Sequence, residues 1–202
     1  MSDIVTVEKF DEMNLKDKLL RGIYGYGFEK PSTIQQKSIL PLIIGKDLIA
    51  QAQSGSGKTG AFCIGALEKI DININNVQVI ILSHTKELAR QTHNVFNELG
   101  DFLNIKTALV IGGINIDESK KILQKGVHAI IGTPGRILHM LNDKCFNIKK
   151  MKILIIDEAD ELLSSGFEEQ LKNIIEILDN NIQIALFSAT LSERCLFLTD
   201  FF

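Results

Sequence analysis

The fold is decided by the stretch Ala52-Gln53-Ser54-Gly55-Ser56-Gly57-Lys58-Thr59. An apolar run that predicts a strand, Asp47-Leu48-Ile49-Ala50, precedes it, and a segment with helical periodicity follows from Thr59 to about Ile70. A glycine-rich loop between a strand and a helix lets backbone N–H groups turn toward a phosphate, and the helix N-terminus adds positive partial charge. The sequence therefore predicts a phosphate-binding loop.

Two side chains at the end of this loop carry the predicted chemistry. Lys58 is placed to reach the β- and γ-phosphates of a nucleotide, and the Thr59 hydroxyl is placed to ligate Mg²⁺. The pattern G-x-x-x-x-G-K-[ST] has glycine where this chain has Ala52, so the loop requires Ala52 to avoid the left-handed conformation. The alternative is an ordinary Gly/Ser turn with a solvated lysine.

Composition sets the class of protein. The chain has 202 residues, 45% of them hydrophobic, which is enough for one well-buried core. Its net charge of −3 provides no general basic field, so any nucleic-acid binding has to come from a local surface. The three cysteines, Cys63, Cys145 and Cys195, form no C-x-x-C pair. This favours a reduced intracellular compartment over a disulfide or zinc framework.

The sequence shows no targeting or membrane-spanning segment. The stretch from Met1 to Asn14 mixes charged and apolar residues, and no apolar run approaches the roughly 20 residues needed to span a bilayer. We therefore expect a soluble protein with no membrane partner. The cytoplasm is the favoured location, with the nucleus as the alternative.

Strand and helix patterns alternate along the chain. Apolar runs predict strands over 77–82, 107–111, 128–131, 153–156 and 183–187, in addition to the strand before the loop. Helical patterns precede the loop over 15–23 and from about 31 to 43, and follow it over 59–70, 86–99, 116–124, 136–141 and 167–178. Runs of Ile, Leu and Val without polar alternation are typical of strands buried on both faces. The sequence therefore predicts an α/β fold with a mostly parallel sheet and helices on both faces.

A polar cluster follows each of the predicted strands. The clusters are the phosphate loop, His84-Thr85-Lys86-Glu87, Gly112-Gly113, Thr133-Pro134-Gly135-Arg136, Asp157-Glu158-Ala159-Asp160 and Ser188-Ala189-Thr190. The carboxyl ends of parallel strands share one edge of a sheet, which is where α/β proteins bind ligands. We therefore expect one site, or two adjacent sites, at this edge.

Two carboxylates follow the most apolar strand. Asp157 comes directly after Ile153-Leu154-Ile155-Ile156, which places it as a second Mg²⁺ anchor opposite the phosphate loop. Its neighbour, Glu158, is suitably placed to orient or deprotonate an attacking water. The alternative is a helix N-cap with a favourable acid in the first turn.

These motifs together resemble the DEAD-box RNA helicases. The residues from Asp157 to Asp160 spell D-E-A-D. Two further segments are most similar to the translation initiation factor 4A branch: Phe28-Glu29-Lys30-Pro31-Ser32 and Asp160-Glu161-Leu162-Leu163. The resemblance implies one RecA-like P-loop domain over 1–202. Residues 1–36 would form an N-terminal flank and Q motif, and residues 37–202 the P-loop core. The family's version of the phosphate loop has alanine at the position of Ala52.

The resemblance implies an ATP site with Mg²⁺. In it, Gln35 would read the adenine edge, Phe28 would stack near the ring, and Phe10 matches the isolated upstream aromatic of the Q motif; Phe28 could equally be a core aromatic. The implied ATP-binding residues are Phe28, Lys30, Gln35, Ser54, Gly55, Ser56, Gly57, Lys58 and Thr59. Catalysis is assigned to Lys58, Asp157 and Glu158, and the metal to Thr59 and Asp157.

A further motif resembles the one that links nucleotide state to RNA binding. Ser188 and Thr190 carry hydroxyls that can change hydrogen bonds near Asp160 as the γ-phosphate comes and goes. The alternative for Ser188 is a helix N-cap.

The resemblance also implies RNA contacts that hold the backbone and give little sequence preference. The residues are Thr85, Lys86, Gly113, Thr133 and Arg136. Where the family has Pro-Thr-Arg, this chain has His84-Thr85-Lys86. The arginine guanidinium, which can bind a phosphate with two hydrogen bonds, is thereby replaced by the lysine ammonium, a single point charge. The glycine pair at 112–113 could equally be a tight turn. Histidines 84, 93, 128 and 139 show no metal-ligand spacing and are assigned no catalytic role, while Phe167 and Leu171 are expected in packing.

Members of the family have two tandem RecA-like domains, and the second provides an arginine finger. No motif resembling the second domain is present in this chain, so we expect it to be the first domain of a longer helicase. Expected partners are RNA, a second RecA-like domain, and scaffold or initiation-factor proteins. A docking module with vestigial ATP binding is the alternative. A P-loop GTPase or small-molecule kinase is disfavoured because an N-K-x-D signature and a lid-like insertion are lacking.

Overall fold

Six strands form one parallel sheet in the computed structural model, which describes residues 7–179, 181–191 and 195. They are β1 (Leu48–Gln51), β2 (Val79–Leu82), β3 (Thr107–Val110), β4 (Ala129–Gly132), β5 (Ile153–Ile156) and β6 (Gln183–Ser188). The spatial order is β1-β6-β5-β2-β4-β3, and every neighbouring pair is parallel. The predicted parallel sheet is confirmed.

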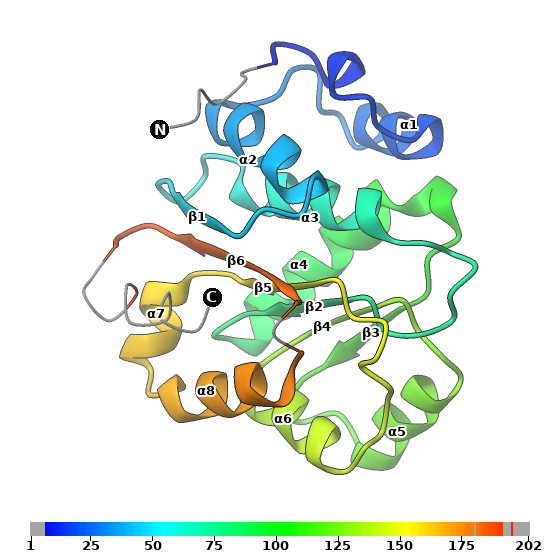
Figure 1. Ribbon diagram of the computed structural model, residues 1–202, viewed down its shortest axis with the longest axis vertical. Coiled ribbons are helices and arrows are strands. Elements are labelled where there is room, and N and C mark those ends of the chain that lie inside the picture. The colour runs from blue at the N-terminus through cyan, green and yellow to red at the C-terminus, as the bar shows by residue number, and fades with distance from the viewer. Residues whose placement is uncertain (1–6, 180, 192–194, 196–202) are drawn as a thin grey trace.

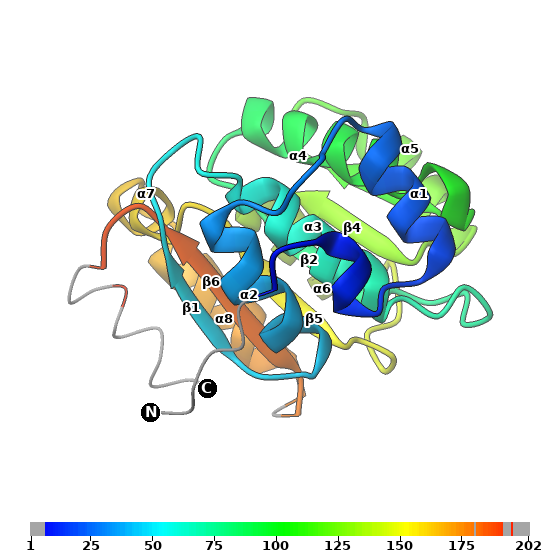
Figure 2. The same ribbon diagram turned by 90° about the horizontal axis from the view of Figure 1, so that it is seen from above.

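Helices cover both faces of this sheet, as predicted (Figure 1). On one face lie α1 (Asp17–Gly25), α2 (Thr33–Ile43), α3 (Lys58–Lys69) and α4 (Lys86–Leu99). On the other lie α5 (Ile116–Gln124), α6 (Pro134–Asn142), α7 (Ala159–Ser164) and α8 (Glu168–Ile177). Figure 2 looks onto the face that carries α1 and α2, with the sheet behind them. Short 3-10 helices, η1 (Phe10–Met13) and η2 (Asp101–Leu103), complete the set in the described ranges.

The apolar strands explain why two layers of helices are needed. Successive side chains of a strand point to opposite faces, so Val79 and Ile81 of β2 pack on the α1–α4 side, while Ile80 and Leu82 pack on the α5–α8 side. All four residues of β2, β4 and β5 are buried. The uninterrupted hydrophobic runs therefore predict this architecture because each strand has no solvent-facing side.

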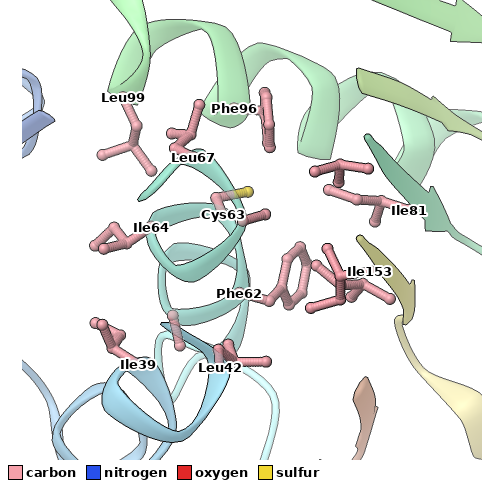
Figure 3. Packing of buried hydrophobic residues seen from close by; sticks show 14 of the residues in the cluster. Ile39, Leu42, Phe62, Cys63, Ile64, Leu67, Ile81, Phe96, Leu99 and Ile153 are labelled. Carbon is pink, nitrogen blue, oxygen red and sulfur yellow. The ribbon is translucent and has the colours of Figure 1, made fainter. Parts of the chain in front are cut away.

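The helix that follows the phosphate loop is the most deeply embedded one. In α3, every residue from 60 to 67 is buried, and Phe62, Cys63, Ile64 and Leu67 have no exposed surface. Figure 3 shows these side chains between Ile39 and Leu42 of α2, Phe96 and Leu99 of α4, and Ile81 and Ile153 of the sheet. Each such side chain contributes about 1.5–3 kcal/mol by leaving water. The start of α3, and the loop attached to it, is consequently held in a fixed position.

Some short elements differ from the sequence-based expectation. The sequence patterns do not predict α7, whose six residues are too few to show a helical period. They also do not predict η1 and η2, which end at Asn14 and Asn104 in the left-handed conformation. Phe167 is the residue before α8 rather than its first residue, and Leu171 is fully buried as expected. The ends of the predicted domain, residues 1–6 and 196–202, lie outside the described residues.

The helices in the described ranges were compared with the dimensions of a bilayer. None of them is both long enough and apolar enough to cross it.

Candidate functional site

The phosphate loop connects β1 to α3 and depends on two left-handed glycines. Gly55 has a φ of 78° and Gly57, the residue before α3, has a φ of 95°. A side chain at Gly57 would also approach the Ser32 hydroxyl to 2.9 Å, so the chain needs glycine there for conformation and for space. Ala52 is not among the residues with positive φ, which is the condition the sequence set for alanine at that position.

Lys58 lies inside this loop rather than in solvent. Its side chain is only 7% exposed, and its ammonium group donates to the carbonyl oxygen of Ala52 across the loop. The Ser56 hydroxyl is buried there and has no hydrogen-bond partner within the protein. A buried lysine together with an unpaired buried hydroxyl excludes the solvated Gly/Ser turn and fits a loop built to surround an anion.

The carboxylate of Asp157 stands at the end of β5. The residue is 2% exposed, and its N–H donates to the Leu82 carbonyl oxygen at 2.9 Å. Burial and the neighbouring charge of Glu158 raise the pKa of Asp157 to about 7, against the opposing effects of Lys58 and the Glu158 N–H. A buried carboxylate in this situation is stabilised in its charged form by a nearby cation.

The donor set at this point fits a magnesium ion. Mg²⁺ prefers oxygen ligands and is commonly held by one or two protein oxygens together with substrate phosphates. Thr59, half-buried at the start of α3, carries a hydroxyl, and Asp157 carries the under-compensated carboxylate described above. These two residues would hold the ion.

Glu158 occupies an unusual backbone conformation. Its φ of 49° and ψ of 55° are left-handed, which costs a non-glycine residue about 1–2 kcal/mol. Its carbonyl accepts the N–H of Leu162, so it occupies the N-cap position of α7, but its side chain makes no capping hydrogen bond. Its Oε2 atom lies 3.0 Å from Nδ1 of His84, a residue to which the sequence assigned no catalytic role.

Asp160, Ser188 and Thr190 form one hydrogen-bonded network. Both the N–H and the hydroxyl of Thr190 donate to Oδ2 of Asp160, at 2.9 and 2.8 Å. The Ser188 hydroxyl accepts the N–H of Asp160 at 3.3 Å and donates to the Thr190 carbonyl at 2.6 Å. Partial burial acts to raise the pKa of Asp160, but the bonds from Ser188 and Thr190 outweigh it and hold the pKa below its usual value.

This network is attached directly to the phosphate loop. The carbonyl of Ser188 accepts the N–H of Ala52 at 3.0 Å, and β6 pairs with β1 along its length. Ser188 does act as a cap, since its hydroxyl accepts an N–H in the first turn of α7, but it caps a helix far away in the sequence. The hydroxyl therefore serves a capping role, and its coupling role stays a prediction.

Gln35 joins the Q motif to the phosphate loop. It is 2% exposed; its amide oxygen accepts the Ser32 N–H at 2.8 Å, and its amide nitrogen donates to the Gly57 carbonyl at 3.3 Å. A glutamine amide has two donor hydrogens and two acceptor lone pairs, so one of each remains for an adenine edge. Adenine recognition by Gln35 stays a prediction.

The aromatic part of the Q motif is packed and partly open. Phe28 stacks on Phe10 with ring centres 6.3 Å apart and contacts Tyr26 edge-on at 4.9 Å. Phe10 is fully buried, whereas Phe28 is half-buried and Lys30 is exposed. Phe28 is thus a core aromatic with one accessible part, which accommodates both roles expected of it.

A second group of predicted residues lines a hollow of about 420 Å³ at the carboxyl ends of β2, β3 and β4. We call it the RNA hollow, after the RNA contacts predicted for some of its residues; its lining residues are His84, Thr85, Lys86, Gly112, Thr133, Gly135, Arg136 and Phe167. Thr85 precedes α4 and caps it by accepting the Leu88 N–H at 3.1 Å, and Thr133 precedes α6. Two helix N-termini with Lys86 and Arg136 make the hollow favourable for phosphates.

Three details of the RNA hollow differ from the sequence-based assignment. Gly112 lines it, while Gly113, with a φ of 94°, is its neighbour in a turn. Arg136 directs one guanidinium nitrogen to the Ile114 carbonyl at 2.9 Å, which ties this turn to α6. Phe167 contributes to the lining as well as to packing. Larger hollows of about 560 and 630 Å³ exist elsewhere, and neither contains a predicted site residue.

The sequence of the chain was compared with known protein families and curated proteins. Residues 32–196 match the DEAD/DEAH box helicase family. The chain is 47% identical over 201 residues to eukaryotic initiation factor 4A of Dictyostelium discoideum, covering 100% of this chain and 50% of that protein. It is 49% identical over 197 residues to ATP-dependent RNA helicase eIF4A of Pyricularia oryzae, covering 98% and 50%.

Solved structures give the same result. A DEAD box protein from Methanococcus jannaschii matches with a TM-score of 0.93 and 38% identity over 97% of this chain and 54% of that one. Saccharomyces cerevisiae Dbp5 bound to RNA and ADP BeF3 matches with a TM-score of 0.88 and 35% identity over 96% and 50%. The chain therefore spans about half the length of the proteins it matches. With the phosphate loop, the carboxylates and the Ser188 network at one sheet edge, this match shows that the chain belongs to the DEAD/DEAH box helicase family.

Proposed function

We propose that this chain is the ATP-binding half of an ATP-dependent RNA helicase, complete only with a second RecA-like domain. One observation carries the proposal: the phosphate loop is hydrogen-bonded to the Ser188–Asp160–Thr190 network through Ala52, at the edge that also bears Asp157 and Glu158. Relatives named as RNA helicases, and a relative bound to RNA and ADP BeF3, support it.

In the nucleotide site, the chain's own residues bind and orient ATP. Loop N–H groups and Lys58 hold the phosphates, while Phe28, Lys30 and Gln35 form the adenine side. Thr59 and Asp157 would hold Mg²⁺, which would supply positive charge beside the phosphates. Glu158 orients a water and accepts its proton as the water attacks the γ-phosphorus, while the bond from that phosphorus to the bridging oxygen breaks and ADP leaves.

In the coupling step, the hydroxyl network reports nucleotide state. Ser188 is bonded to the phosphate loop by its backbone and to α7 by its side chain, so a shift of the loop is transmitted to Asp160. Thr190 donates two hydrogen bonds to the Asp160 carboxylate, one from its N–H and one from its hydroxyl. Exchange among these few bonds is a two-state element of the kind that switches use.

The RNA hollow binds the phosphate backbone of one strand. Thr85 and Thr133 provide helix N-termini, Lys86 and Arg136 provide charge, and Gly112, in the turn with Gly113, provides close approach. Contacts of this type position RNA and carry little sequence preference. We also propose a cytoplasmic role in translation initiation, with scaffold or initiation-factor proteins as partners.

The test is the ATPase rate of the full-length protein with and without single-stranded RNA. We expect stimulation by RNA and loss of activity in Lys58→Ala, with Lys121→Ala on the exposed surface of α5 as the matched control. Lack of any RNA stimulation in the unmodified protein would contradict the proposal. A Lys58→Ala protein that performs its cellular role normally would favour the docking-module alternative.

A further inference from the structure

His84 touches the glutamate that is proposed to orient the attacking water. Its Nδ1 atom lies 3.0 Å from Oε2 of Glu158, and both side chains are largely shielded, with 20% and 25% of their surface exposed. The Nδ1 atom itself is buried and has no aligned hydrogen-bond partner, so the contact is at bonding distance but short of ideal geometry.

The register of the sheet creates this contact. β2 pairs with β5 so that Leu82 lies beside Ile156, and the pairing extends one step further because the Asp157 N–H donates to the Leu82 carbonyl. His84 and Glu158 each follow their partner of this pair by two residues, so the same register brings them together. The contact between these two side chains therefore follows from the pairing of β2 with β5.

His84 also belongs to the RNA hollow. It lines that hollow with Thr85, which caps α4, and with Lys86 and Arg136. Ser83, just before it, donates its N–H to the Gly132 carbonyl at 2.9 Å, which fixes the backbone between β2 and β4. One side chain thus connects the RNA hollow to the water-orienting carboxylate.

We propose that His84 is a positioning residue for Glu158 and that RNA in the hollow acts on hydrolysis through it. An RNA phosphate beside Thr85 and Lys86 would hold the His84 imidazole in one orientation. The imidazole would in turn align the Glu158 carboxylate. The inference rests on the proposed function, because it assigns a route by which RNA stimulates the ATPase. It adds a residue that sequence reasoning left without a role.

The experiment measures RNA-stimulated ATPase of the full-length protein and of His84→Leu and His84→Asn. The asparagine amide can place an N–H where Nδ1 stands, whereas leucine cannot. We expect His84→Leu to lower the RNA-stimulated kcat about tenfold, since small misplacement of a catalytic group has effects of this order or larger. KM for ATP should stay within about twofold, and His84→Asn should recover most of the lost kcat.

Two further variants separate this role from a loss of folding. His139→Leu makes the same chemical change on α6, away from both sites, and should leave kcat unchanged. In a Glu158→Gln background, His84→Leu should have no further effect, because the partner it positions is gone. Equal kcat in His84→Leu and the unmodified protein, or a loss that His84→Asn does not reverse, would overturn the inference alone. Absence of RNA stimulation in the unmodified protein would instead overturn the proposed function and this inference with it.

Discussion

The two halves of the candidate site are built in different ways. At the ends of β1, β6 and β5, polar groups are already bonded to one another: the buried Lys58 to the phosphate loop, the buried Ser188 to the loop and to α7, and the exposed Thr190 to Asp160. At the ends of β2 and β4, the RNA hollow has exposed or half-buried side chains such as Thr85 and Lys86. Preorganised buried groups suit a small ligand of fixed shape, whereas exposed charges suit a flexible polyanion.

The difference predicts large effects of substitution on the nucleotide side and small effects on the RNA side. The largest is expected for Glu158→Gln in the full-length protein. It should lower kcat about 100-fold or more, because a general base contributes at least that much, while ATP affinity stays within about twofold. Glu161→Gln, on the exposed surface of α7, is the control. A normal kcat in steady-state ATPase assays would remove Glu158 from its assigned role.

The next largest effect is on stability, through Asp157→Asn. The pKa of Asp157 is about 7 in the folded chain against 3.8 for an ordinary aspartate, so the folded state holds a proton that the unfolded state releases. Folded-state stability is therefore lost as pH rises from about 4 to about 7, and the neutral asparagine avoids this loss. Without Mg²⁺ at pH 8, the variant should be more stable by roughly 2 kcal/mol.

Urea denaturation across this pH range measures the difference. The advantage of Asp157→Asn should shrink toward zero near pH 4, where both proteins carry a neutral group at this position. Asp101→Asn, which makes the same chemical change at an exposed aspartate, is the control. An advantage that is the same at pH 4 and pH 8 would show that burial of charge is not its cause.

A smaller effect is expected for Gln35→Ala. It removes the bonds to Ser32 and Gly57 and the groups left for adenine, so ATP should bind about tenfold more weakly and lose its preference over GTP. The control is Gln36→Ala, on the same helix as Gln35. It removes a hydrogen bond to the Pro31 carbonyl and should leave nucleotide selection unchanged. Nucleotide titration with ATP and GTP measures both; unchanged ATP affinity in Gln35→Ala would refute the assignment.

The smallest effect is expected in the RNA hollow. Lys86→Ala should weaken binding of single-stranded RNA a few-fold and reduce the salt slope of binding by about 0.7, the value for one phosphate contact. Lys86→Arg should bind at least as well as the unmodified protein, because guanidinium can hold a phosphate with two bonds. Lys121→Ala, which removes the same charge from an exposed position on α5, is the control. A salt slope unchanged in Lys86→Ala would place this residue outside the RNA contact.

Sequence patterns were sufficient for the sheet, the helices on both faces and the edge that carries the polar clusters. They were sufficient because β2, β4 and β5 are buried on both faces, and such strands leave uninterrupted apolar runs. The loop glycines were also readable, since positive φ at Gly55 and Gly57 leaves a composition signal.

Contacts across the sheet could not be read from the sequence. His84 meets Glu158 only because β2 lies beside β5, and strand order is not written in the periodicity of either strand. The bond from Gln35 to Gly57 and the capping of α7 by Ser188 depend on the same long-range placement. α7 was missed for a local reason, because it has six residues and follows a left-handed Glu158.

The pairing of β1 with β6 has a consequence for how this domain is made. The strand that ends at the phosphate loop is held by the last described strand, and the Ile184 N–H reaches Asp47 across 137 residues of chain. Contacts of such long sequence separation form late, because the loop they close must first be ordered. On the ribosome, the residues of α3 are therefore synthesised long before those of β6, which complete the site at the phosphate loop. The proposed nucleotide site is therefore complete only after β6 has been synthesised and has paired with β1.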